Sequence, residues 1–405
     1  MKLADLETFV VGTPPPGYGG RYFLFVKLTT ACGIVGYGEV YAGSLAPDVM
    51  EAVVGDVFAR HMAGRDPHDV EAMFRSVYSA GFSQRPDPTV IGAFSGLEIA
   101  CWDILGQAHD LPAYKLLGGE ITTRIRTYSY LYPGEGDEDA EFYASPERSA
   151  AQAAKMVEEG FTAIKFDPAG PYTIMGGHMP FMEDLARSTA FCSALREAVG
   201  DRADLLFGTH GQFTPGGAKR MAQAIAPYQP LWFEEPVPPD TPSAMAEVAK
   251  ASPVPIAAGE RLCTRWEFQP LLAAGAVQIV QPALGRVGGL WEARKLAVLA
   301  EAHGAQVAPH LYAGPIEWAA NLQLAACIPN FLIAETILKG GGFHAELLDV
   351  PLAWEDGHVM LSERPGLGVR LNEDVARAHP YTGDRLHLEM QPKPHGQNAQ
   401  GFAQG

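Results

Sequence analysis

Leu231-Trp-Phe-Glu-Glu235 and Pro255-Ile-Ala-Ala-Gly-Glu260 are two short apolar runs that each reach a glutamate, Glu234 in the first and Glu260 in the second. A stretch of helical length lies between the two runs. Strands that alternate with helices form a parallel sheet. Because neighbouring parallel strands end at the same edge, the carboxylates of Glu234 and Glu260 are expected to converge there.

The same unit recurs on both sides of this pair. Eight strand-like runs occur within about 215 residues, and the last seven are each entered from a helical stretch. This number predicts a closed (β/α) barrel, here over residues 122–346. The other six runs are residues 124–132, 163–167, 204–208, 277–281, 305–310 and 331–335.

Polar residues are concentrated at the carboxyl ends of these strands. In barrels of this type the active site lies at that end, whereas polarity at the opposite end indicates stability only. The sequence therefore predicts that one site contains Lys165, Asp167, His210, Glu234, Glu235, Glu260, His310 and Glu335.

The regions outside the barrel have a different pattern. Residues 1–121 combine strand-like runs at 9–12, 22–30 and 33–38 with a helical region at 46–106, which indicates a small α+β domain. Residues 347–390 include a strand-like segment that is expected to pack back onto this domain. Residues 391–405 are polar and glycine-rich, and we predict a disordered tail there.

Composition excludes several classes of function. The chain has 405 residues and a formal net charge of −17, which argues against binding to nucleic acid. No segment resembles a signal peptide or a membrane span. The five cysteines are widely spaced and form no CxxC pair, which favours reduced thiols in a cytoplasmic protein.

Two carboxylates at one barrel mouth repel each other unless they are protonated or bridged by a cation. Their hard oxygen ligands favour Mg²⁺ or a similar ion. The alternative is a structural ion pair between one of the two, Glu234 or Glu260, and Arg261 or Arg286.

Several motifs in order resemble one family over residues 1–390. The chain resembles the enolase superfamily, mandelate racemase subgroup. The resemblance implies a capping domain built from both termini, a modified TIM barrel of the (β/α)7β type, and proton abstraction α to a carboxylate assisted by Mg²⁺ or Mn²⁺. It also implies a sugar-acid substrate, dehydration and a homo-oligomer. The motifs are Gly96–Gly106, Leu116–Gly119, Phe233-Glu-Glu-Pro236, Ala258-Gly-Glu260, Gln281–Gly289 and Pro309-His310.

Two positions depart from the family pattern. Gly208 stands where relatives carry a third metal carboxylate, so Asp167, His210 or water would have to complete a metal site with Glu234 and Glu260. Ala283 stands where many relatives have an aspartate that orients the histidine corresponding to His310. Another group would then have to set the tautomer of this ring.

The resemblance also implies roles at the other strand ends. Lys165 matches the first lysine of a Lys-x-Lys motif, and Asp167 replaces the second, which weakens a two-base racemase and suits a dehydratase. His210 resembles the catalytic histidine of sugar-acid dehydratases, and His310 a catalytic base or acid. Glu335 resembles a residue that binds the substrate carboxylate.

Substrate specificity is expected to come from loops outside the barrel. The loop at residues 14–21 matches a mobile loop of the capping domain, from which Tyr18 and Arg21 could reach the substrate. The glycine-rich insertion at residues 170–179 is a candidate lid.

The leading hypothesis is a dehydratase that converts an aldonate or aldarate to a 2-keto-3-deoxy acid. One alternative is an epimerase, racemase or cycloisomerase that uses the same enolate chemistry. The other is a non-catalytic binding protein with a degraded metal site, which the loss of family groups at Gly208 and Ala283 motivates.

Overall fold

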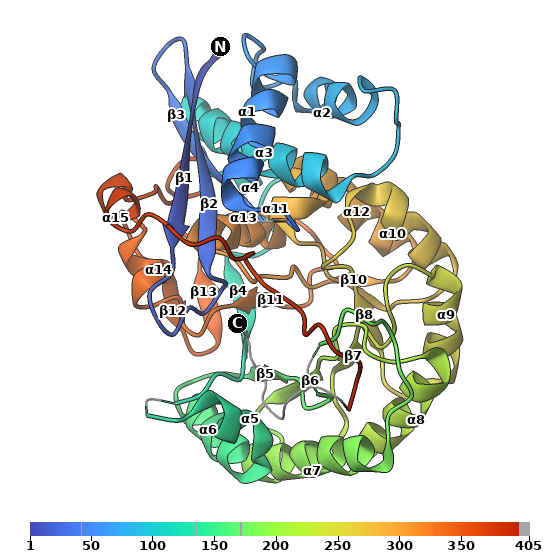
Figure 1. Ribbon diagram of the computed structural model, residues 1–405. Coiled ribbons are helices and arrows are strands. Elements are labelled where there is room, and N and C mark those ends of the chain that lie inside the picture. The colour runs from blue at the N-terminus through green and yellow to red at the C-terminus, as the bar shows by residue number, and fades with distance from the viewer. Residues whose placement is uncertain (42, 135, 171, 397–405) are drawn as a thin grey trace.

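Eight parallel strands form a closed barrel in the computed structural model, which describes residues 1–41, 43–134, 136–170 and 172–396 (Figure 1). Each strand pairs in parallel with the next, and the last, β11, pairs with β4. A bridge between Val307 and Phe331 joins β10 to the segment that enters β11. The predicted barrel is therefore confirmed. Its strands are β4 (Arg124–Tyr130), β5 (Ala163–Phe166), β6 (Asp204–Phe207), β7 (Trp232–Glu234), β8 (Ile256–Ala258), β9 (Ile279–Val280), β10 (Gln306–Val307) and β11 (Ala334–Thr336).

Seven longer helices connect these strands, which gives the (β/α)7β arrangement. Several begin at proline, whose missing N–H costs nothing in a first helical turn, and Thr214 accepts a hydrogen bond from Gly217 N at one of these starts. The helices are α6 (Pro146–Glu158), α7 (Met182–Val199), α8 (Pro215–Ile225), α9 (Pro242–Ala251), α10 (Thr264–Ala273), α12 (Gly289–Ala302) and α13 (Pro315–Ala326). Shorter helices are α5 (Asp139–Ala144), α11 (Leu284–Val287) and α14 (Phe343–Glu346).

A layer of buried side chains fills the barrel interior. Tyr128 packs against Trp232 with ring centroids 5.3 Å apart, and smaller side chains occupy the rest of the layer. This packed layer is a solid floor and not a pore. The polar groups at the carboxyl ends of the strands are therefore accessible only from that side. The smaller members are Ala163, Leu206, Ala257, Ile279, Ala308 and Ile333.

The capping domain consists of a three-stranded antiparallel sheet and helices packed against it. Helix α3 is apolar enough to span a membrane, but it is buried among the other elements as a core helix. The strands are β1 (Leu3–Gly12), β2 (Tyr22–Thr30) and β3 (Val35–Val40), and the helices are α1 (Pro47–His61), α2 (Val70–Ser79), α3 (Pro88–His109) and α4 (Ala113–Leu116).

Two buried glutamates of the capping domain join it to the barrel. Glu39 accepts hydrogen bonds from Gly314 N and Glu317 N at the start of α13. Glu98 accepts hydrogen bonds from Leu290 N and from the next residue in the first turn of α12. A carboxylate at a helix N-terminus satisfies free N–H groups and the helix dipole. Both contacts place the capping domain beside the helices that flank β10.

The chain after the barrel returns to the capping domain. The strands β12 (Ala353–Glu355) and β13 (His358–Met360) extend the sheet next to β4. The strand-like segment at 363–371 forms turns and isolated bridges, and Asp103 of α3 accepts a hydrogen bond from Leu367 N. Helix α15 (Glu373–Ala378) follows beside β1.

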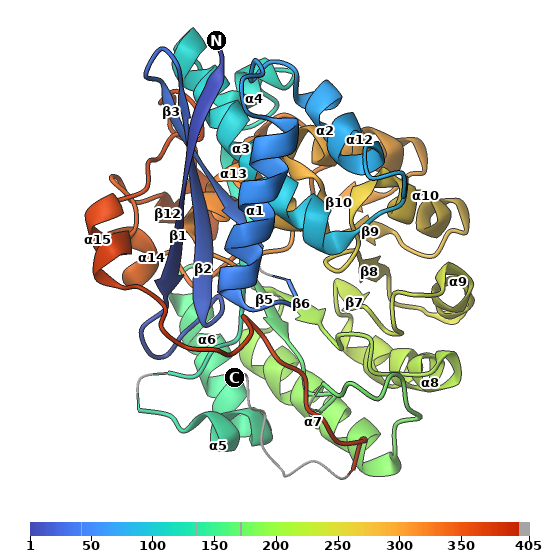
Figure 2. The same ribbon diagram turned by 45° about the horizontal axis from the view of Figure 1, so that its top comes forward.

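Residues 386–396, called the C-terminal segment below, are the last described part of the chain and cross the mouth of the barrel (Figure 2). Gln391 N donates to Tyr172 O over 2.7 Å, and Thr173 Oγ1 donates to Lys393 O over 2.6 Å. The prediction of disorder is therefore wrong for residues 391–396, because these tertiary hydrogen bonds order a segment whose composition is polar. The remaining residues of the predicted tail, 397–405, lie outside the described residues.

The close approach of β3 to α3 gives a test of the capping domain. A Cβ added to Gly38 would lie 1.9 Å from Gly96 O, whereas one added to Gly55 in α1 would meet nothing within 4 Å. Gly38→Ala should destabilise the protein by at least about 1–3 kcal/mol, and Gly55→Ala should stabilise it by about 0.5–1 kcal/mol. Thermal unfolding of the two variants measures both effects. Equal midpoints would contradict this packing.

Candidate active site

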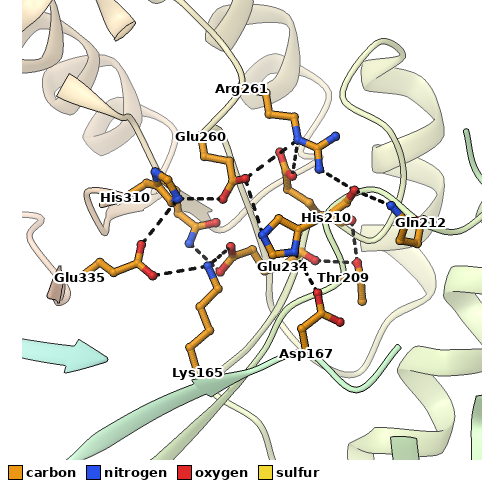
Figure 3. Close-up of polar contacts among 12 residues, drawn as sticks. Lys165, Asp167, Thr209, His210, Gln212, Glu234, Glu260, Arg261, His310 and Glu335 are labelled. Carbon is orange, nitrogen blue, oxygen red and sulfur yellow. Dashed lines mark hydrogen bonds and ion pairs between the residues drawn. The ribbon is translucent and has the colours of Figure 1, made fainter. Parts of the chain in front are cut away.

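The predicted strand-end residues come together at the barrel mouth, and five of them line one cavity there (Figure 3). Lys165, His210, Glu260, His310 and Glu335 all line it, although they come from five different strand ends. Such convergence follows from the parallel arrangement of the strands. The rest of the wall is largely aromatic and consists of Tyr41, Tyr130, Tyr132, Tyr172 and Tyr312, together with Leu388.

Lys165 forms the central ion pair of the site. Its Nζ donates to Glu234 Oε1 over 2.5 Å and lies 3.6 Å from Glu335 Oε1. Trp232 Nε1 and Gln281 Nε2 donate to the other oxygen of Glu234, at 2.9 and 2.8 Å. Burial alone would lower the pKa of Lys165, but the charges of Glu234 and Glu335 raise it well above its usual value. Lys165 is therefore an ammonium cation at neutral pH.

Asp167 and His210 form a second buried pair. Asp167 Oδ2 lies 2.8 Å from His210 Nδ1. Burial alone would lower the pKa of His210, but the hydrogen bond to Asp167 and the charge of Glu260 raise it. The backbone of His210 is left-handed, with a φ of 49°, which turns the ring over the end of β6. The pair therefore stabilises a protonated imidazole at the cavity wall.

The space beside Gly208 explains why Asp167 reaches this ring. A Cβ at position 208 would lie 3.4 Å from Lys165 Cε and 3.7 Å from Asp167 Oδ2. The side chain of a larger residue would compete with Asp167 for this space. Glycine at position 208 thus leaves room for the pair of Asp167 and His210.

Glu260 lies between the two histidines. Its Oε1 is 3.9 Å from His210 Nε2, and its Oε2 is 3.3 Å from His310 Nε2. Among the described residues, Glu260 Oε2 accepts no hydrogen bond of good geometry. Arg261 Nε is closer to Glu235 Oε2, at 3.0 Å, than to Glu260 Oε1, at 4.0 Å. Glu235 therefore provides the ion pair for Arg261, and Glu260 keeps an unused oxygen toward the cavity.

Among the described residues, no carboxylate is bonded to Nδ1 of His310. Ala283 bridges to His310 through the backbone, and within the described residues the buried Nδ1 has no hydrogen-bond partner. Burial lowers the pKa of His310 to about 4, and the charge of Lys165 adds to this effect. The ring is therefore neutral at pH 7. Glu260, whose Oε2 is 3.3 Å from Nε2, and the ring of Tyr41, whose centroid lies 5.8 Å away, border the His310 ring.

The carboxylates at the mouth have the chemistry of a divalent-cation site. Glu234 and Glu260 are buried, and the unused Oε2 of Glu260 is an oxygen ligand of the kind that Mg²⁺ prefers. Asp167 does not line the cavity, because its carboxylate is bonded to His210 and to Ala169 N. Glu260 therefore offers the unused oxygen for a hard cation, and Glu234 would have to exchange a hydrogen bond from Lys165 or from Trp232 and Gln281 for such an ion. Asp167 supports His210.

Tyr18 and Arg21 lie outside this cavity. They line a neighbouring pocket, and of the residues that the structure describes Tyr312 alone borders both. Tyr18 stacks on Tyr132 at a centroid distance of 4.1 Å. Arg21 Nη1 donates to Leu386 O over 2.6 Å, so the guanidinium is bonded to the C-terminal segment.

The C-terminal segment contributes residues that the motifs do not indicate. Leu388 lines the cavity, and His387 is buried among aromatic rings that include Tyr41 and Tyr312. The insertion after β5 contributes Tyr172, whose ring lies 4.0 Å from that of His210. The insertion is the one expected as a candidate lid, whereas the C-terminal segment carries no sequence signal for this position, because tertiary contacts alone bring it over the mouth.

Comparisons with known proteins agree with this architecture. The family model described as enolase C-terminal domain-like matches residues 148–375, and that of the mandelate racemase/muconate lactonizing enzyme N-terminal domain matches residues 18–118. A D-xylonate dehydratase from Haloferax volcanii is 33% identical over 96% of this chain and 91% of its own length. A D-galactonate dehydratase from Pectobacterium atrosepticum is 33% identical over 93% of both chains.

A solved structure is similar over nearly its whole length. The mandelate racemase/muconate lactonizing enzyme from Sulfitobacter sp. is 59% identical, with a TM-score of 0.95 over 97% of this chain and 99% of its own. Two domain models in order, relatives that cover the chain and the barrel-mouth constellation give the same answer. The chain belongs to the mandelate racemase/muconate lactonizing enzyme family of the enolase superfamily.

Proposed function

We propose that this protein dehydrates a sugar acid, an aldonate or an aldarate, to a 2-keto-3-deoxy acid. The proposal rests on two histidines that line one cavity in different settings, His210 bonded to Asp167 and His310 with an unpartnered Nδ1 among the described residues; their pKa values move in opposite directions accordingly. Groups whose environments separate their pKa values are suited to act as base and acid. The names of the relatives, which are aldonate dehydratases, support the substrate class.

His310 is the proposed base. A neutral imidazole can accept the proton from the α-carbon of the substrate, and a pKa of about 4 keeps His310 neutral at pH 7. His210 is the proposed acid, because its raised pKa favours the imidazolium form. As the bond between the β-carbon and its hydroxyl breaks, His210 donates a proton and water leaves. The resulting enol then takes a proton at the β-carbon and loses the proton of its hydroxyl group, which gives the keto acid.

Lys165 and Glu335 are the proposed binding groups for the substrate carboxylate. The ammonium of Lys165 supplies a positive charge, and Glu335 can donate a hydrogen bond if it is protonated, since burial raises its pKa. The tyrosine hydroxyls of the wall suit the hydroxyl groups of a sugar chain. Both histidines then lie beside the carbon atoms next to the bound carboxylate.

Mg²⁺ or Mn²⁺ is the proposed cofactor, held by Glu234 and Glu260 with water or substrate as the further ligands. When bound, such an ion neutralises the charge that develops on the substrate carboxylate as the α-proton leaves. His210 is assigned as the acid and not as a third ligand, because metal ligation requires a neutral imidazole. Asp167 is a positioning residue that holds His210 in its protonated form.

A cytoplasmic location is also proposed. All five cysteines are free, and four of them are buried. Free thiols of this kind are typical of a reducing compartment.

A panel of aldonic and aldaric acids tests the proposed reaction. With Mg²⁺ or Mn²⁺ present, we expect at least one acid to yield a 2-keto-3-deoxy acid, which semicarbazide detects. Xylonate, galactonate and gluconate are the first acids to try, because related dehydratases carry these names. Failure of every acid in a broad panel would contradict the proposal.

Asp167→Asn tests the assignment of His210 as the acid. Without the negative charge the pKa of His210 falls, so activity is lost at a lower pH on the alkaline side of the profile. We also expect kcat to fall by about 10²–10⁴-fold, the usual contribution of a general acid. Asp204→Asn is the matched control, because Asp204 pairs with Arg126 at the opposite end of the barrel. Identical pH profiles for wild type and Asp167→Asn would exclude this role for His210.

Metal removal tests the cofactor. Exhaustive chelation should abolish turnover, and Mg²⁺ should restore it in the wild type but not in Glu260→Gln, which lacks one of the two anionic ligands. Circular dichroism of the chelated protein and of the variant checks that both remain folded. Full activity after chelation would contradict the proposed cofactor and would show that the cations of Lys165 and His210 suffice.

A further inference from the structure

A second polar cluster lies outside the barrel mouth, where the C-terminal segment meets the insertion after β5. His178 belongs to this insertion, Asp184 to the first turn of α7, and His395 to the end of the described chain. Within the described residues, these three form the one group of histidine, cysteine and acidic side chains whose ligand atoms all lie within 4.8 Å of one another. The strand-end residues do not gather so closely.

The two imidazoles have unused nitrogen atoms in a buried setting. His395 Nε2 lies 2.9 Å from Asp184 Oδ2, and the side chain of His395 is only 9% exposed. Among the described residues, neither nitrogen of His178 nor Nδ1 of His395 has a hydrogen-bond partner. A buried polar atom without a partner costs about 1–3 kcal/mol. Ligation to a metal ion would satisfy such atoms.

Hydrogen bonds fix the backbone of His178 and the carboxylate of Asp184. The backbone of His178 is bonded on both sides, His178 N to Gln212 O at 2.8 Å and His178 O to Thr214 N at 2.9 Å. Asp184 Oδ2 also accepts a hydrogen bond from Phe181 N, and its Oδ1 binds Arg187 Nη2 at 2.9 Å. The rings of His178 and His395 are stacked, with centroids 3.6 Å apart, so one ring must turn about its side-chain bonds before both can direct a nitrogen at one ion.

Neutral imidazole is the form that binds metal ions. Both nitrogens of His178 lack a hydrogen-bond partner among the described residues, so either is open to an ion. Two imidazole nitrogens and one carboxylate oxygen suit Zn²⁺ and similar ions, whereas Mg²⁺ and Ca²⁺ prefer oxygen ligands alone. Arg187 offsets the charge of Asp184, which further disfavours a hard cation that relies on anionic ligands.

We propose that His178, Asp184 and His395 form a binding site for a late first-row divalent metal ion such as Zn²⁺, separate from the site at Glu234 and Glu260. Water completes the coordination. The ion fastens the C-terminal segment to the insertion after β5. Leu388 of the same segment lines the catalytic cavity, so the ion also steadies that wall.

Zinc titration of the full-length protein in excess Mg²⁺ tests this site. Wild type should bind one more equivalent of Zn²⁺ than His178→Ala or His395→Ala, or should bind it at least about 100-fold more tightly, since even an outer-shell change costs about 10–100-fold. His303→Ala is the matched control. This histidine is exposed, directly follows α12 and lies far from the cluster in the sequence.

A second measurement does not depend on affinity. Zn²⁺ should slow hydrogen exchange and proteolysis of residues 386–396 in the wild type and in His303→Ala, but not in His178→Ala, which leaves the C-terminal segment itself unchanged. Equal zinc binding by the wild type and both cluster variants would overturn the proposal. Absence of zinc binding by the wild type would overturn it as well, whatever the dehydratase assays show.

Discussion

The buried ion pair between Lys165 and Glu234 is the interaction on which the site depends. Removing both charges from water costs several kcal/mol per ion, and only close pairing with further hydrogen bonds offsets this. The site supplies these bonds from Trp232 and Gln281, and Glu335 provides a second anion beside the ammonium. Residues from four strands, β5, β7, β9 and β11, must meet within a few ångströms for this balance. A closed barrel with a packed floor meets that requirement.

The site lies below two covering parts of the chain, the capping domain and the C-terminal segment. Their position matters for the same reason, the energetic cost of burying charge. Buried groups change their pKa most strongly where water is excluded, and here the capping domain and the C-terminal segment exclude it. Glu39 of the capping domain binds the start of α13, the helix that follows His310. Arg21 binds the C-terminal segment near Leu388. The capping domain and the C-terminal segment therefore both exclude water from the histidines that we propose as base and acid.

The barrel could be predicted from sequence because its signals are local: eight apolar runs and polar residues at their ends. The positions of Glu234 and Glu260 at strand ends could be predicted for the same reason. The pairing of Asp167 with His210 could not be predicted. Gly208 shows in the sequence only that a carboxylate is missing, and the space that lets Asp167 reach His210 becomes visible only in the folded structure. The segment at 391–396 was mispredicted, since its order comes from bonds to residues 172 and 173, distant in sequence.

The central claim is that the barrel mouth removes a proton from the α-carbon and a hydroxyl from the β-carbon of a sugar acid. Turnover in D₂O followed by ¹H NMR tests it most directly. Dehydration should give a 2-keto-3-deoxy acid that carries one solvent deuterium at C3, with recovered substrate unlabelled or labelled only at C2. Deuterium at C2 of the recovered acid or its epimer, without any keto acid, would contradict dehydration and identify an epimerase instead.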